Sequence, residues 1–76
     1  MSKPTLHARH QMARRRITQG ELDDALTRIE TAYPARDHPD REVVLCRTFG
    51  GRRFKVVRPY ADPDVIITVA DRGIEE

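Results

Sequence analysis

The sequence predicts an α+β domain in which two N-terminal helices pack on a three-stranded antiparallel sheet, in the order ααβββ. The first half of the chain has apolar residues at helical spacing, and the second half has Val-rich runs separated by turn residues. With 76 residues there is room for one domain, with an ordered core expected over about residues 5–70. Only the helices are available to cover the apolar face of the sheet.

The first helix is expected over residues 5–16, after a frayed end at residues 1–4. Thr5 can serve as its N-cap, and the arginines at 14–16 fall in its last turn, where the helix dipole favours cations. Its apolar stripe is predicted to contain Leu6, Ala13 and Ile17, with Met12 beside it.

The second helix begins with a capping box, because Thr18 is followed three residues later by Glu21. One apolar face then repeats at i, i+3, i+4, i+7 and i+11. The residues on this face are Leu22, Ala25, Leu26, Ile29 and Tyr33. Pro34 ends the predicted helix, since the residue before a proline avoids helical geometry.

Three strands are predicted after a polar loop, over residues 41–49, 52–60 and 65–70. Gly50-Gly51 is a two-residue hairpin signal between the first two strands, and residues 61–64 form the second turn. The Val-Ile-Ile run of the third strand favours the sheet centre or burial on both faces. Residues 71–76 are expected to be an acidic tail.

Side chains alternate between the two faces of a strand, which assigns the residues of the second strand. Phe54 and Val56 are expected to face the helices. Arg53 and Lys55 are expected to face solvent, together with Arg47 from the first strand.

Composition excludes several classes of protein. No apolar run approaches the ~20 residues of a membrane span, and the basic N-terminus lacks the apolar region of a signal peptide, so none is expected. The single cysteine, Cys46, cannot form an internal disulfide and is predicted to be a buried core residue. We therefore expect a cytoplasmic protein without a membrane partner.

Charge alternates along the chain more strongly than the net charge of +2 suggests. Residues 1–20 carry five Lys/Arg and no acid, and residues 41–60 carry six Lys/Arg and one acid. If folding brings these two segments together, they form a positive face suited to nucleic acid or an acidic protein. Ordinary surface charge on a polar domain explains the same pattern, and the sequence does not separate the two interpretations.

The candidate chemistry is that of a metal-independent ribonuclease. No metal site, cofactor site or activated nucleophile is predicted, and Gly50-Gly51 joins strands rather than cradling a phosphate. Imidazoles can move protons, and guanidinium groups bind phosphate with paired hydrogen bonds. The acid–base candidates are His7 and His10, with Arg15 beside them. The candidate nucleic-acid-binding residues are Arg47, Arg52, Arg53, Lys55, Arg58 and Tyr60, the last of which can stack on a base or serve as an acid.

Three segments resemble a family of small bacterial domains without an assigned function. They are the opening helix with His7-Ala8, Met12, Arg15 and Ile17, the Gly51–Val57 hairpin and the Val65–Val69 strand. Two positions depart from the pattern, because Gln11 replaces its arginine and Arg16 its glycine. The fold of that family is similar to the RelE/ParE and BrnT toxins of type II toxin–antitoxin systems. The resemblance implies a small basic toxin that acts on messenger RNA, either free or on the ribosome, and that is neutralised by a small antitoxin protein.

Two hypotheses follow. The first is a toxin-like RNA endonuclease in which His7, His10 and Arg15 act beside the basic residues of the hairpin. The second is a non-catalytic module that binds nucleic acid or an acidic protein through the same face. Catalysis in the first requires a histidine and at least two of the arginines to converge on one hollow.

Overall fold

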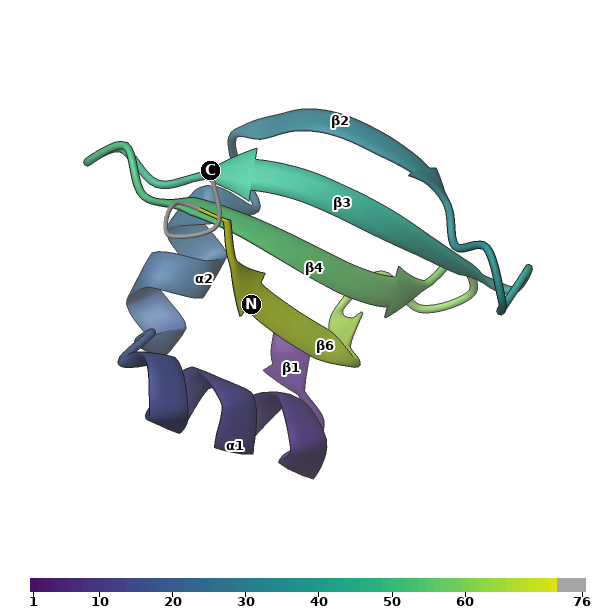
Figure 1. Cartoon of the computed structure of the whole chain (residues 1–76), viewed down its shortest axis with the longest axis horizontal. Coiled ribbons are helices and arrows are strands. Elements are labelled where there is room, and N and C mark those ends of the chain that lie inside the picture. Colours follow the sequence, from purple (N-terminus) through teal and green to yellow (C-terminus); the bar gives the residue numbers. More distant parts are fainter. Residues whose placement is uncertain (73–76) are drawn as a thin grey trace.

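The computed structural model describes residues 1–72 (Figure 1). Its elements are β1 (Lys3–Pro4), α1 (Leu6–Arg15), α2 (Gln19–Ala25), β2 (Ile29–Pro34), β3 (Arg41–Arg47), β4 (Arg53–Pro59), β5 (Val65–Ile66) and β6 (Thr68–Asp71). The main sheet is antiparallel with strand order β2-β3-β4-β6, and β1 pairs in parallel with β5. The predicted α+β class is confirmed, but the sheet has four strands rather than three.

The caps of both helices agree with the sequence. Thr5 Oγ1 accepts a hydrogen bond from the amide of Ala8, and the Thr18–Glu21 capping box is present in both directions. The apolar stripe of α1 was predicted correctly only in part, because Ile17 is buried but Ala13 is exposed and Leu6 is 68% exposed. The helix turns Ala8 and Met12 toward the core instead.

The second helix ends much earlier than the sequence predicts. α2 stops at Ala25, and the residues expected in its last two turns form strand β2. Ile29, Thr31 and Tyr33 fit a strand as well as a helix, because β-branched and aromatic side chains at alternate positions favour a pleated sheet. Pairing with β3 decides between the two periods, and this explains the additional strand.

The last predicted strand is divided in two. Val65 and Ile66 belong to β5 and pair with Lys3 and Pro4, so residues 3–4 are not a frayed end. β6 lies at an edge of the main sheet and not at its centre, and it includes Asp71, which was expected in the tail. Residues 73–76 of the predicted tail lie outside the described residues.

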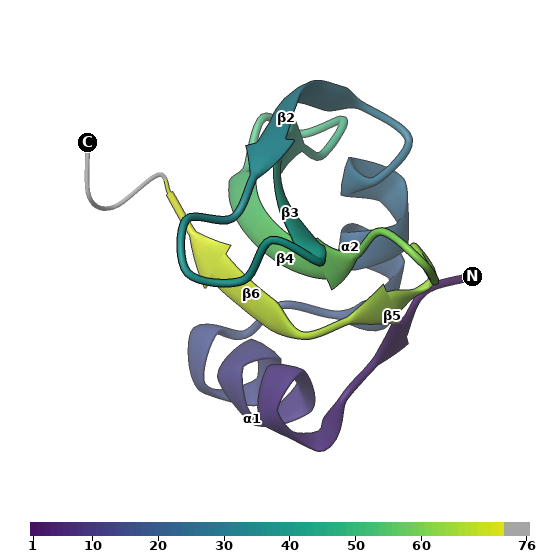
Figure 2. The ribbon, with the colours of Figure 1, turned by 90° about the vertical axis from the view of Figure 1, so that its right-hand side faces the viewer.

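Both helices lie on the same side of the curled sheet (Figure 2). The core that they enclose contains Ala8, Met12, Ile17, Leu22, Ala25, Val44, Cys46, Phe54, Val56, Ile66 and Val69. Phe54 and Val56 are fully buried, as predicted, and Lys55 on the other face is exposed. No helix within residues 1–72 is long and apolar enough to cross a membrane.

The hairpin between β3 and β4 turns through three residues rather than two. The amide of Thr48 donates to the carbonyl oxygen of Arg52, and the amide of Gly51 donates back to Thr48. Gly51 alone of the two glycines has a positive φ, of 93°, where a side chain would be strained. The turn leaves Phe49 85% exposed at its tip.

Candidate nucleic-acid interface

The outward surface of α1 is basic along its whole length. The helix contains no carboxylate, and its exposed basic side chains are His7, Arg9, His10, Arg14 and Arg15, followed by Arg16 at the C-cap. None of these four arginine side chains has an ion pair or a hydrogen bond within residues 1–72. Their charge is therefore available to an external anion.

Other arginines of the domain are neutralised locally. Arg28 pairs with Asp24, and Arg58 Nε lies 2.8 Å from Glu42 Oε2. Arg72 reaches across the end of the sheet, where it donates to Glu30 Oε1 at 2.7 Å and to the carbonyl oxygens of Phe54 and Cys46. This bond from Arg72 is the main reason that the pKa of Glu30 is lowered. The contrast with α1 separates structural arginines from those that can bind a ligand.

Arg52, a predicted phosphate ligand, is one of the structural arginines. Its Nη1 and Nη2 atoms donate to the carbonyl oxygens of Arg16 and Arg15 at 3.0 and 2.6 Å. Its guanidinium also pairs with Glu21 at 3.2 Å and with Asp71 at 2.9 Å. Arg52 thus joins the β-hairpin, both helices and β6, and all three nitrogen atoms of its guanidinium donate hydrogen bonds within the fold.

The pKa of Glu21 is lowered chiefly by the hydrogen bond from the backbone of Thr18, against the opposing effect of desolvation, and further by Arg52. A carboxylate at this position therefore stays ionised and holds Arg52 in place. The same pair of interactions fixes the first turn of α2 beside the last turn of α1.

The end of α1 is a Schellman motif. The amide of Ile17 donates to the carbonyl oxygen of Met12, and the amide of Arg16 donates to Ala13. Arg16 has φ 56° and ψ 45°, the left-handed conformation that usually selects glycine. The chain therefore carries an arginine where a glycine would be less strained.

The structure does not bring the histidines of α1 and the predicted hairpin ligands into one hollow. The side chains of Arg47, Arg53 and Lys55 alternate with those of Cys46, Phe54 and Val56, so they lie on the sheet face that no helix covers. His7 and His10 belong to the layer on the opposite face. The predicted convergence on one site is absent, although Arg52 does hold the basic end of α1 beside the hairpin.

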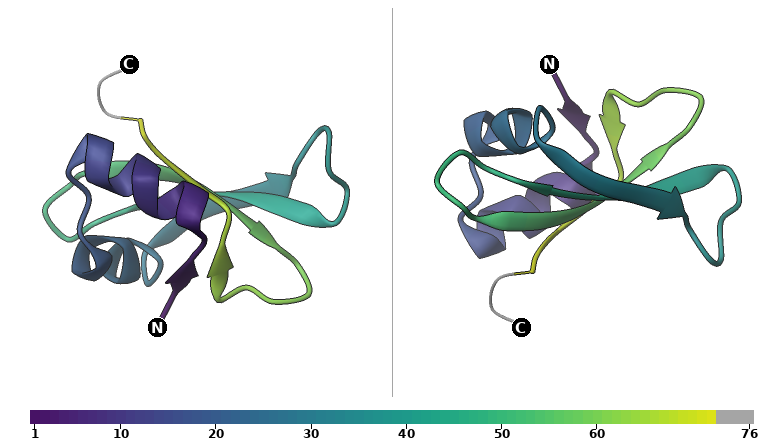
Figure 3. Two further views of the ribbon diagram at one scale, coloured as in Figure 1. Left: turned by 90° about the horizontal axis from the view of Figure 1, so that it is seen from below. Right: turned by 90° about the horizontal axis from the view of Figure 1, so that it is seen from above.

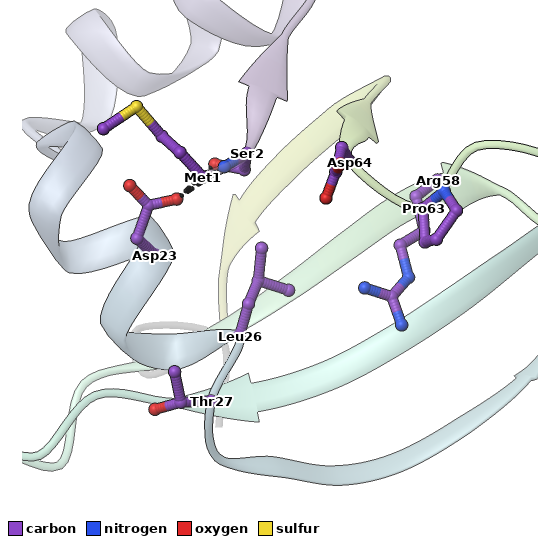
Figure 4. Close-up of a pocket in the computed structure, with 8 residues that line it drawn as sticks. All are labelled: Met1, Ser2, Asp23, Leu26, Thr27, Arg58, Pro63 and Asp64. Atoms are coloured by element: carbon purple, nitrogen blue, oxygen red, sulfur yellow. Dashed lines mark hydrogen bonds between the residues drawn. The ribbon is translucent and has the colours of Figure 1, made fainter.

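Arg58 and Tyr60 also lie apart from α1's outward surface. Arg58 lines a hollow of about 340 Å³ between the N-terminus, α2 and the turn after β4 (Figure 4). The carboxylates of Asp23 and Asp64 line the same hollow, which disfavours a phosphate there. Tyr60 is 48% exposed at the end of the sheet away from the hairpin tip.

A shallow groove of about 320 Å³ adjoins the basic surface of α1. It is lined by Pro4, Arg9, Met12, Ala13, Ile17 and Gln19. Its lining combines the apolar residues Pro4, Ala13, Met12 and Ile17 with the polar residues Arg9 and Gln19. A flat apolar group joined to an anion, such as a base with its phosphate, matches this combination. Arg9 was one of several basic residues in the sequence, and no pattern there singled it out.

Gln11 has a structural role that sequence reasoning missed. Its Oε1 atom accepts a hydrogen bond of 2.9 Å from the amide of Val69, on the outer edge of β6. The side chain thereby closes an edge that would otherwise be open to another strand. No sequence pattern reveals this bond, because it depends on α1 lying along β6.

Metal and thiol chemistry gain no support from the described residues. Within residues 1–72 no group of three His, Cys, Asp or Glu side chains is arranged to hold a metal ion. Burial raises the pKa of the Cys46 thiol to about 11, so this cysteine is a core residue rather than a nucleophile.

Comparison with known proteins gives one match. Residues 5–71 match the model of a family described as a domain of unknown function, DUF4258. No curated protein and no solved structure matches the chain. The match spans almost the entire described chain, and the protein therefore belongs to the DUF4258 family.

Proposed function

We propose that this domain binds RNA and that helix α1 holds the phosphodiester backbone. The proposal rests on one observation above all. The side chains of Arg9, Arg14, Arg15 and Arg16 are exposed and have no partner within residues 1–72, whereas those of Arg28, Arg52, Arg58 and Arg72 are paired. Guanidinium groups that remain unpaired on a helix without carboxylates create a concentrated positive field.

The groove beside α1 supports a single-stranded ligand. A base of a single strand can turn out of the stack and rest against the accessible apolar lining residues Pro4 and Ala13, while Arg9 binds its phosphate. A double helix keeps its bases inside and would contact only the arginines. We therefore expect single-stranded RNA to bind more tightly than a duplex of equal length.

The experiment is a titration of labelled single-stranded RNA by fluorescence anisotropy at several salt concentrations. If the four arginines contact phosphates, log K falls with log salt with a slope of about −3. The variants Arg9→Ala and Arg14→Ala should each reduce that slope by about 0.7. Arg36→Ala is the matched control, because Arg36 is exposed and unpaired in a distant loop.

Equal weakening by Arg36→Ala would show that binding follows overall charge, and the proposed interface would then be wrong. Unchanged affinity in both α1 variants would contradict it equally.

A second candidate is metal-independent RNA cleavage on the same helix, as a toxin would perform. His7 and His10 are both exposed and one turn apart, and Arg14 follows one turn later. One imidazole can accept the proton of the ribose 2′-hydroxyl while the other donates a proton to the leaving 5′-oxygen. Arg14 would stabilise the charge that develops on the phosphate.

One assay distinguishes RNA cleavage from RNA binding without cleavage. Purified protein is incubated with RNA in the presence of chelator, with and without ribosomes. Cleavage that His7→Ala and His10→Ala abolish, while both variants still bind RNA, supports catalysis. Intact RNA in every condition leaves a binding module. A toxin should also arrest growth on expression, and an acidic antitoxin should relieve the arrest.

A further inference from the structure

The two edges of the main sheet are treated differently. Gln11 closes the β6 edge through its bond to Val69, whereas no element within residues 1–72 covers the outer edge of β2. All six residues of β2 are exposed, including Ile29 at 42% and Tyr33 at 44%. Seen from above in the right panel of Figure 3, β2 crosses the front of the molecule with no other element over it.

The backbone of Ala32 points away from the sheet. The amide of Ala35 donates to the carbonyl oxygen of Arg41, so Ala35 faces β3, and Pro34 is the next residue in register. Because backbone groups of a strand point alternately to its two sides, Pro34 and Ala32 present theirs outward. Pro34 fits this position, since it has no N–H to donate to β3.

The middle of β2 lacks the charges that usually protect an edge strand. Its only ionised side chain is Glu30, which Arg72 of the same chain neutralises. The register shift between Ile29 and Thr31, and Pro34 at the other end, confine any further pairing to a short stretch centred on Ala32. Such a stretch accommodates a partner in one register.

The charges at the two ends of β2 are complementary. Arg47 is an exposed cation at the end where β2 begins, beside the hairpin tip. The loop after β2 and the turn after β4 lie together at the other end, joined by the bond from Tyr60 to Asp40 (Figure 1). That end carries four aspartates against two arginines: Asp37, Asp40, Asp62 and Asp64 against Arg36 and Arg41.

We propose that β2 pairs antiparallel with β2 of a second copy of this chain, about a two-fold axis at Ala32. Antiparallel pairing sets the basic end of each copy beside the acidic end of the other. The two Ala32 residues exchange two backbone hydrogen bonds, and their small side chains lie directly opposite one another. An isologous contact of this kind closes after two copies.

The dimer would have one continuous eight-stranded sheet with all four helices on one side. Its two β6 strands, each with an α1 helix beside it, would be about 34 Å apart measured along the curved sheet, at a strand spacing of about 4.8 Å. If α1 binds RNA as proposed above, one RNA strand could contact both helices, and this consequence alone rests on the proposed function.

The test uses the full chain and sedimentation equilibrium in the absence of RNA. The wild-type protein should show a concentration-dependent mass approaching twice 8.8 kDa. Ala32→Lys and Ala32→Asp should each be monomeric, because like charges then face each other across the axis. An equimolar mixture of the two variants should restore the dimer, since opposite charges now meet.

Thr27→Lys is the matched control, because Thr27 is exposed just before β2 and adds the same charge away from the axis. Circular dichroism of each variant separates loss of pairing from unfolding. A wild-type protein that stays monomeric at its highest soluble concentration overturns the proposal. A dimer that survives Ala32→Lys, or a mixture that stays monomeric, overturns it too.

Discussion

Arg52 of the hairpin donates a hydrogen bond of 2.6 Å to the carbonyl oxygen of Arg15, the last residue of α1. Carbonyl groups at the end of a helix have no partner within the helix, and a guanidinium is well suited to satisfy them. The bond ties the basic helix to the hairpin across 37 residues of sequence. It also explains why a residue with the appearance of a phosphate ligand serves the fold instead.

Replacing Arg52 should destabilise the domain. Arg52→Ala removes bonds to two helix carbonyls and to the carboxylates of Glu21 and Asp71, and we expect a loss of about 2–3 kcal/mol in the free energy of unfolding. Arg52→Lys should recover only part of this loss, because an ammonium lacks the planar fork. Urea denaturation measures the difference.

Lys55→Ala is the control for Arg52, since Lys55 is exposed on the uncovered face and its loss should change stability by less than about 0.5 kcal/mol. Similar urea midpoints for Arg52→Ala and Lys55→Ala would show that the bonds of the Arg52 side chain do not stabilise the fold.

Acid should destabilise the domain through its paired carboxylates. The pKa of Asp24 is lowered first by the hydrogen bond from the amide of Phe49 and then by Arg28, and the pKa values of Glu21 and Glu30 are lowered too. A lowered folded-state pKa adds stability above the ordinary values of 3.8 for Asp and 4.5 for Glu, and this stability is lost as the pH falls through the folded values.

The measurement is the free energy of unfolding between pH 7 and pH 2. Glu21→Gln keeps the acceptor of the capping box but cannot titrate, so its stability should depend less on pH below 4.5 than that of the wild type. If the free energy of unfolding depends on pH in the same way for both proteins, Glu21 does not contribute to the loss of stability in acid.

The sequence predicted the parts of the fold that local chemistry determines. The capping box of Thr18 and the inward side chains of Phe54 and Val56 were confirmed, because spacing alone decides them. β2 was missed because the apolar positions from Ile29 to Tyr33 satisfy both a helical and a strand period. Only tertiary pairing with β3 distinguishes them.

Only part of the candidate site could likewise be predicted from the sequence. The basic character of α1 follows from its composition, whereas the role of Arg52 depends on carbonyl groups that folding brings to it. The separation of Lys55 from His7 and His10 likewise depends on which face of the sheet the helices cover. A list of basic residues cannot contain this information, since it does not state which of them meet a carboxylate.

Arg16→Gly should stabilise the domain. Arg16 has φ 56°, and a non-glycine residue in this region costs about 1–2 kcal/mol. Part of the gain is offset because glycine makes the unfolded chain more flexible, so we expect a net increase of about 0.5–1 kcal/mol. Thermal unfolding should show the higher midpoint, and a lower midpoint would mean that the Arg16 side chain contributes to folding.

The same variant links stability to binding. Arg16 is one of the four unpaired arginines of the proposed interface, so Arg16→Gly should weaken RNA binding and lower its salt slope by about 0.7 while it stabilises the fold. A gain in stability together with a loss of RNA affinity would show that Arg16 strengthens binding but destabilises the end of α1.

Gln11→Arg provides the complementary case. A guanidinium has no hydrogen-bond acceptor, so the amide of Val69 loses its partner and the β6 edge opens, at a cost of about 1 kcal/mol. The amide of Val69 should then exchange with solvent faster, which hydrogen exchange monitored by NMR can detect. The added charge on α1 should strengthen RNA binding. Gln11→Glu keeps an acceptor for Val69 but adds a negative charge, so it should preserve the protection of Val69 and weaken binding. Equal protection of Val69 in both variants would show that the Gln11 side chain does not close this edge.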